Sequence, residues 1–142
     1  SDSYMVFKGQ YTGSASGLSG IATNEIYLIA AECYARLNNV DKAMELLNTL
    51  LVTRWKNGTF IPFSANNSNE ALSIILRERR KELLFRGIRW ADLKRFNRDG
   101  ANINLTKLVN GKTYVLPPND LRYAIAIPED IIIMTGILQN KR

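Results

Sequence analysis

Hydrophobic residues recur at three- and four-residue spacing from residue 23 to about residue 97, which predicts a series of amphipathic α-helices. The predicted helices cover residues 23–37, Asp41 to about 50, 68 to about 85, and 88–97. Thr23 or Asn24 is the expected cap of the first helix. Asn67 or Ser68, followed by Glu70, marks the start of the third helix, and Gly87 ends it. The fold class predicted from this pattern is mainly α.

The first two predicted helices are joined by a turn so short that they must pack antiparallel. The first is apolar almost all round, so we expect it to be mostly buried, with Cys33 as a small hydrophobic residue on its inner face. Small and aromatic residues in the pair follow a tetratricopeptide-like spacing, namely Tyr27, Ala31, Tyr34, Ala43 and Leu47. The pattern therefore predicts tetratricopeptide-like antiparallel helix pairs.

The two ends of the chain do not follow the helical pattern. Residues 1–22 are rich in Gly and Ser and predict a connector with a short edge strand at Tyr4–Phe7. Short strands at 112–116 and 122–127 predict a β-hairpin around a turn at 117–120, and Pro128 opens a last helical turn that Gly136 closes. We expect a single domain or fragment over 1–142, with a connector (1–22), a helical core (23–98), and a hairpin with terminal turn (99–142).

The charge of the chain is concentrated in one segment. Residues 77–98 hold nine Lys or Arg and three acidic residues, which accounts for the whole net charge of +6. Such a cationic helix suggests nucleic-acid binding. However, Arg79 falls in the middle of the apolar stripe formed by Ile75 and Leu83, where a phosphate-binding residue would point outward. We therefore expect no nucleic-acid partner, and instead an internal ion network of Glu78, Arg79, Glu82, Arg89 and Asp92.

Several kinds of chemistry are disfavoured by composition. The chain has no histidine and one cysteine, which excludes an internal disulfide and a multi-cysteine zinc site and removes the commonest general base. Glu78 and Glu82 lie one helical turn apart, but the neighbouring arginines lower carboxyl pKa values and oppose a protonated general acid. We therefore expect no enzyme activity, no metal and no cofactor. No apolar run approaches the roughly 20 residues that a membrane-spanning helix requires.

Trp55 is a weak candidate for ligand binding. It follows the second predicted helix and precedes the polar turn at 56–58. An exposed indole there would provide a stacking platform for a sugar ring, whereas a buried one would pack against the helix pair. The sequence leaves both interpretations open.

Several segments resemble, in order, the C-terminal region of the SusD/RagB family of outer-membrane glycan-binding lipoproteins. Residues 24–37 are similar to the family's helix with the motif E-x-Y-L-x-x-A-E-A, and residues 43–48 to A-x-x-x-L-N. Residues 78–95 are similar to the signature E-R-R-x-E-L-x-F-E-G-x-R-W-x-D-L-x-R, with Arg86 where the family usually has Glu. Residues 127–130 and 136–140 resemble the closing I-P-x-x-E and Q-N-P elements.

The resemblance implies a function as well as a fold. It implies a non-catalytic component of an outer-membrane polysaccharide uptake system that binds oligosaccharide or polysaccharide and works with a TonB-dependent transporter. It implies a cell-surface location, with membrane attachment only through a lipid anchor outside this chain. Family members are several hundred residues long, and no binding residue can be carried across by resemblance. The helix-pair spacing leaves an alternative, a tetratricopeptide-like protein-interaction module.

Overall fold

The computed structural model describes residues 20–142, and the predicted edge strand at Tyr4–Phe7 lies outside the described residues. The chain divides into two compact units, Ser1–Gly87 and Ile88–Arg142. The fold is mainly helical with one small antiparallel sheet, which confirms the predicted fold class. The arrangement of a single domain with a helical core over 23–98 stays a prediction.

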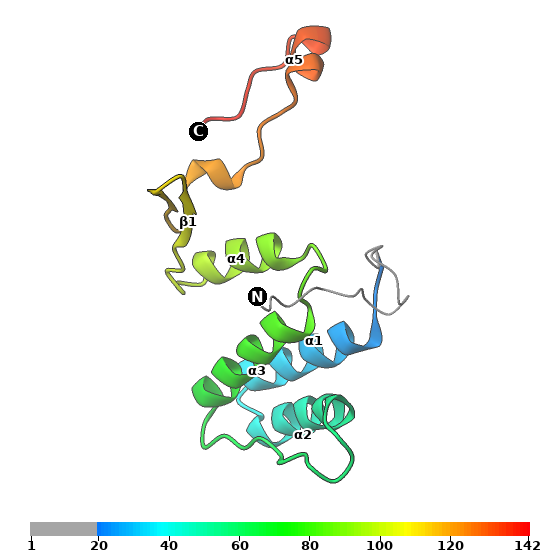
Figure 1. Cartoon of the computed structure of the whole chain (residues 1–142). Helices are drawn as coiled ribbons and strands as arrows, with labels where there is room; N and C mark the ends of the chain where they lie inside the picture. Colours follow the sequence, from blue (N-terminus) through cyan, green and yellow to red (C-terminus); the bar gives the residue numbers. More distant parts are fainter. Residues whose placement is uncertain (1–19) are drawn as a thin grey trace, which may run out of the picture. The chain divides into compact units, whose positions relative to one another are not determined.

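Three helices form the described part of the first unit. They are α1 (Thr23–Arg36), α2 (Val40–Leu51) and α3 (Ser68–Glu82). They lie side by side, with α1 in contact with both of the others (Figure 1). A single 3₁₀ turn, η1 (Val52–Arg54), follows α2 directly, and the chain then runs without regular structure to α3.

The helix starts follow the polar residues in the sequence at two of three places. Asn39 caps α2 by accepting a hydrogen bond from the Lys42 amide, and Asn67 caps α3 by accepting from the Glu70 amide. The cap predicted for α1 was wrong. Ala22 occupies that position without a side-chain hydrogen bond, because the Asn24 side chain is buried inside the unit and directed at another helix.

Small residues allow the three helices to approach closely. Ala31, Ala35, Ala43 and Ala71 are at most 1% exposed, and between them the larger Leu28, Leu47 and Ile75 are fully buried. This is the dense interior that stabilises the unit.

The prediction that Cys33 is buried was wrong, because its side chain is exposed. At 100° per residue, Cys33 lies on the side of α1 away from Leu28 and Ala31, together with Ile26 and Leu37, which are also exposed. The helix has two apolar faces, and only the one that carries the small residues packs against α2 and α3.

The second unit begins with α4 (Arg89–Arg98), followed by β1 (Leu105–Val109) and β2 (Lys112–Leu116). The strands pair antiparallel, with Leu105 opposite Leu116. A hairpin is present, but the predicted pairing of 112–116 with 122–127 was wrong. The turn lies at Asn110 and Gly111, whose φ values of 49° and 75° match the left-handed conformation that a two-residue hairpin turn requires.

Most of the chain beyond β2 has no regular secondary structure. A 3₁₀ turn, η2 (Leu121–Tyr123), occupies the start of the segment that was predicted as a strand. The short helix α5 (Glu129–Thr135) follows Pro128 and ends at Gly136 with φ of 70°, as predicted.

Candidate functional site

Three aromatic rings gather on the segment between α2 and α3. The Trp55 and Phe60 ring centroids are 5.9 Å apart at an interplanar angle of 59°, and those of Phe60 and Phe63 are 6.4 Å apart. These separations lie in the range of favourable aromatic contacts. Trp55 is 49% exposed, so one part of the indole rests on Phe60 while another faces solvent. We call Trp55, Phe60 and Phe63 the aromatic cluster.

The far end of this segment is tied to α2 by one side chain. The Asn48 amide donates to the Phe63 carbonyl and accepts from the Phe63 backbone N–H, both at 2.9 Å. The two bonds satisfy both backbone groups of Phe63 as a strand partner would. The third ring of the aromatic cluster is therefore held at a defined place against α2.

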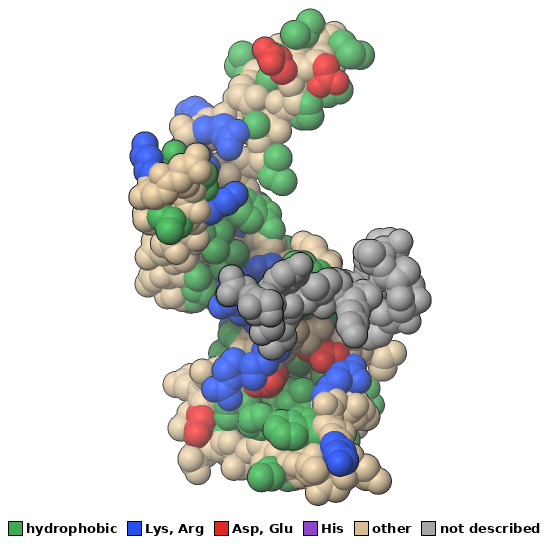
Figure 2. Space-filling view, viewed as in Figure 1, with side chains coloured by type: hydrophobic (Ala, Val, Ile, Leu, Met, Phe, Trp, Pro, Cys, Tyr) green, Lys and Arg blue, Asp and Glu red, His purple; other side chains and the backbone are tan. Residues whose placement is uncertain are grey.

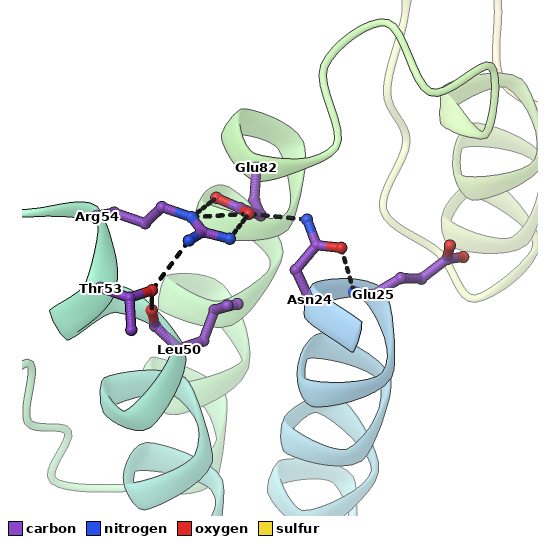
Figure 3. A network of polar contacts seen from close by, with 6 residues as sticks. All are labelled: Asn24, Glu25, Leu50, Thr53, Arg54 and Glu82. Atoms are coloured by element: carbon purple, nitrogen blue, oxygen red, sulfur yellow. Dashed lines mark hydrogen bonds and ion pairs between the residues drawn. The ribbon is translucent and has the colours of Figure 1, made fainter. Parts of the chain in front are cut away.

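The near end is tied by an ion pair. Arg54, directly before Trp55, places Nε 3.0 and 3.1 Å from the two carboxylate oxygens of Glu82 and Nη2 2.6 Å from Oε1. Its Nη1 donates to the Thr53 hydroxyl, which in turn donates to the Leu50 carbonyl. Figure 3 shows Arg54 extended from the end of η1 toward the last turn of α3. Because Arg54 precedes Trp55 in the chain, this contact also restrains the indole.

Glu82 also connects α3 to α1. The buried Asn24 side chain donates from Nδ2 to Glu82 Oε1 at 2.8 Å, approaching from the side opposite Arg54 (Figure 3). Only 13% of the Glu82 side chain is exposed, whereas 39% of the Arg54 side chain is. One carboxylate on α3 thus links that helix to α1 and to η1 at one end of the unit, beside the aromatic cluster.

The residues of the predicted ion network lie in both units. In the first unit, Arg79 is 6% exposed and its Nη2 lies 4.0 Å from Glu25 Oε1. Glu78 accepts from Lys81 at 2.7 Å, and Glu82 has the contacts described above. In the second unit, Asp92 accepts from Arg95 at 3.1 Å, and Arg89 is half-buried. A single network of all five stays a prediction.

Sequence reasoning identified Trp55 but missed the groups that position it. Phe60 and Phe63 were detectable, since three aromatic residues within nine positions of a polar loop are a recognisable cluster. The pairing of Arg54 with Glu82 joins residues 28 positions apart and has no local signal.

Arg86, where the family motif usually has Glu, is almost fully buried. Its side chain is 4% exposed, with Nη2 3.8 Å from Glu25 Oε2 and 2.5 Å from the Gly20 carbonyl. Glu25 thus faces two guanidinium groups, from Arg79 and Arg86. The departure from the motif places a cation at the start of α1, next to an acidic residue of its first turn.

Within residues 20–142, no group of three or more Cys, Asp or Glu side chains is arranged to hold a metal ion. In the same part of the chain, no helix is both long and apolar enough to cross a bilayer.

Comparison with known proteins gives a family match and a fold match. The model of the SusD family matches residues 12–131, which confirms the resemblance seen in the sequence. The crystal structure of a SusD-like protein from Bacteroides fragilis NCTC 9343 is similar over 82% of this chain, with a TM-score of 0.54 and 23% sequence identity. The chain spans 24% of the length of that protein. No curated protein matches.

Proposed function

Because this chain belongs to the SusD family, we propose that it is the C-terminal part of a non-catalytic glycan-binding protein that serves nutrient uptake at the cell surface. The family match over residues 12–131 is the observation that carries the proposal. The fold similarity to a SusD-like protein supports it, over about a quarter of that protein's length. The rest of such a protein would supply the lipid anchor in the outer membrane and the contacts with a TonB-dependent transporter.

Within this chain, the aromatic cluster is the proposed place of sugar contact. A sugar ring has one face rich in C–H groups, and such a face stacks on an exposed indole. The half-exposed Trp55 presents that surface, and Phe60 contacts the indole. Because the segment is tied at both ends by Arg54 and Asn48, little conformational freedom is lost when a ligand binds.

The test is a titration of the chain with soluble neutral and acidic polysaccharides, followed by calorimetry, alongside a pool of peptides. We expect saturable binding of at least one polysaccharide, and Trp55→Ala to weaken it about tenfold. Tyr114→Ala is the matched control, since Tyr114 is an aromatic residue of similar exposure (52%) on the hairpin. Equal loss in both variants would remove Trp55 from the site.

The same titration separates the proposal from the alternative of a protein-interaction module. Binding of peptides with no binding of any polysaccharide would favour the helix-pair interpretation and contradict the glycan-binding proposal.

A further inference from the structure

The second unit contains a cavity of about 590 Å³ between α4 and the segment 119–124. Its lining combines the apolar residues Ala91, Leu121 and Tyr123 with the charged residues Lys94, Arg95, Arg98 and Asp120; we call Lys94, Arg95 and Arg98 its cationic rim. The volume lies within the roughly 300–1,000 Å³ that is usual for small-molecule sites. The cavity is formed entirely by residues of the C-terminal unit and shares no residue with the aromatic cluster.

The sequence of α4 explains why one side of the cavity is cationic. Residues 91, 94, 95 and 98 are spaced by three and four positions, so they share one face of the helix. On the face of the molecule that Figure 2 shows, Lys and Arg side chains lie over the region of α4 and the hairpin, and no acidic side chain is visible there.

The opposite wall is held in place by Tyr123. Its ring centroid lies 4.8 Å from that of Trp90, and its backbone carbonyl accepts from the Trp90 indole N–H at 3.3 Å. The Tyr123 hydroxyl accepts from the buried Asn97 side chain, also at 3.3 Å. Tyr123 itself is only 5% exposed. These contacts fix the cavity wall against α4 before any ligand binds.

The acidic groups near the cavity are already occupied. Arg122 donates to both carboxylate oxygens of Asp120 at 2.8 Å, and these hydrogen bonds lower the pKa of Asp120 to about 2. Asp92 accepts from Arg95 at 3.1 Å, and Asp99 lies 3.7 Å from Arg98.

Lys94 is different from these basic residues. It is exposed and forms no ion pair among residues 20–142. In each ion pair described above, the negative charge of the acidic side chain offsets the positive charge of its basic partner. The rim of the cavity therefore keeps the positive charge of Lys94.

We propose that this cavity binds an acidic saccharide, with the carboxylate or sulfate of the sugar at Lys94 and Arg98 and the apolar face of its ring against Leu121. The inference deepens the glycan-binding proposal and rests on it. A sugar with an anionic substituent uses both features of the cavity, an apolar wall and a cationic rim one helical turn long. A neutral sugar would use only the apolar wall, so the cavity favours charged over uncharged saccharides.

The test compares oligogalacturonate with the same oligosaccharide after methyl esterification, which removes the negative charge and keeps the backbone. Binding is measured by calorimetry at low and at moderate salt. We expect oligogalacturonate to bind more tightly than its ester, and the difference to shrink as salt screens the charges. Inorganic phosphate serves as a probe for a site that takes any anion.

Lys94→Glu and Lys107→Glu form a matched pair of variants. Both change the net charge by the same amount, and both positions are exposed, but Lys107 lies on β1 outside the cavity. We expect Lys94→Glu to weaken oligogalacturonate binding about fivefold or more and Lys107→Glu to have little effect. Circular dichroism of each variant confirms that the fold is retained.

The outcomes separate this inference from the proposal on which it rests. Equal affinity for oligogalacturonate and its ester, or equal effects of the two variants, would overturn the acidic-sugar site while leaving glycan binding intact. If millimolar phosphate displaced bound oligogalacturonate as effectively as added oligogalacturonate does, the cavity would be a general anion site. That result would also overturn the acidic-sugar site. Binding of no saccharide, charged or neutral, would overturn both proposals.

Discussion

Replacing Glu82 by alanine tests the idea that one carboxylate holds the end of the helical unit together. The substitution removes the acceptor of the buried Asn24 amide at 2.8 Å and the partner of Arg54 at 2.6 Å. The helices α1 and α3 and the turn η1 then lose their shared contact. Because the last residue before Trp55 is released, the variant should also loosen the aromatic cluster.

The expected loss of stability follows from the burial of each partner. Loss of an acceptor for the buried Asn24 amide costs about 1–3 kcal/mol. Loss of the Arg54 ion pair costs about 0.2–1 kcal/mol, because 39% of that side chain is exposed and the charge is screened by solvent. Removing an acidic residue from the last turn of α3 returns about 0.3–1 kcal/mol. The free energy of unfolding should therefore fall by about 2 kcal/mol.

The assay is urea denaturation of the chain followed by tryptophan fluorescence, with Glu82→Gln as the comparison. Glutamine keeps an oxygen for Asn24 and loses only the charge, so it should cost about 0.5–1 kcal/mol. In a double-mutant cycle with Arg54→Ala, the coupling energy should shrink as salt is added. A change of less than about 0.5 kcal/mol for Glu82→Ala, which is usual for surface positions, would refute the reasoning.

Three further predictions concern other parts of the chain. Arg79 is 6% exposed, so Arg79→Ala should lower the free energy of unfolding by more than about 2 kcal/mol. Lys94→Ala should leave that free energy nearly unchanged. Equal urea denaturation midpoints for the two variants would contradict this. Arg122 holds the pKa of Asp120 at about 2, so stabilisation by this pair is complete above the ordinary value of 3.8 and lost as the pH falls through about 2. Carboxyl NMR should show that pKa rising toward 3.8 in Arg122→Gln. The exposed Cys33 thiol should react with a disulfide reagent in the native chain about as fast as in urea, and strong protection would place it in the interior.

Local features of the sequence predicted most of the secondary structure. Asn67 with Glu70 predicted the start of α3, and Gly136 predicted the end of α5, because capping depends on a few adjacent backbone groups. The Asn110–Gly111 turn could also have been predicted from the sequence, since both residues readily adopt positive φ. Its omission led to the wrong strand pairing.

The residues of the candidate sites also divide into those with a local sequence signal and those that only the tertiary structure brings together. Trp55 stood out because an aromatic residue beside a polar turn is a local signal. Its positioning by Arg54 and Glu82 depends on residues 28 positions apart, and the cavity joins α4 to a segment more than twenty residues further along the chain. Neither arrangement has a repeating pattern that sequence reading can detect.

By itself, the order of residues established the family, the helical class, most element boundaries and the location of the positive charge, because these depend on neighbours in the chain or on motifs within one segment. Tertiary packing determined which apolar face of α1 is buried. Both faces are hydrophobic, and only contact with α2 and α3 selects the one with Ala31 and Ala35 and leaves Cys33 exposed. The partner of each buried charge was settled in the same way, because the free energy of an ion pair depends on distances that only the folded chain creates.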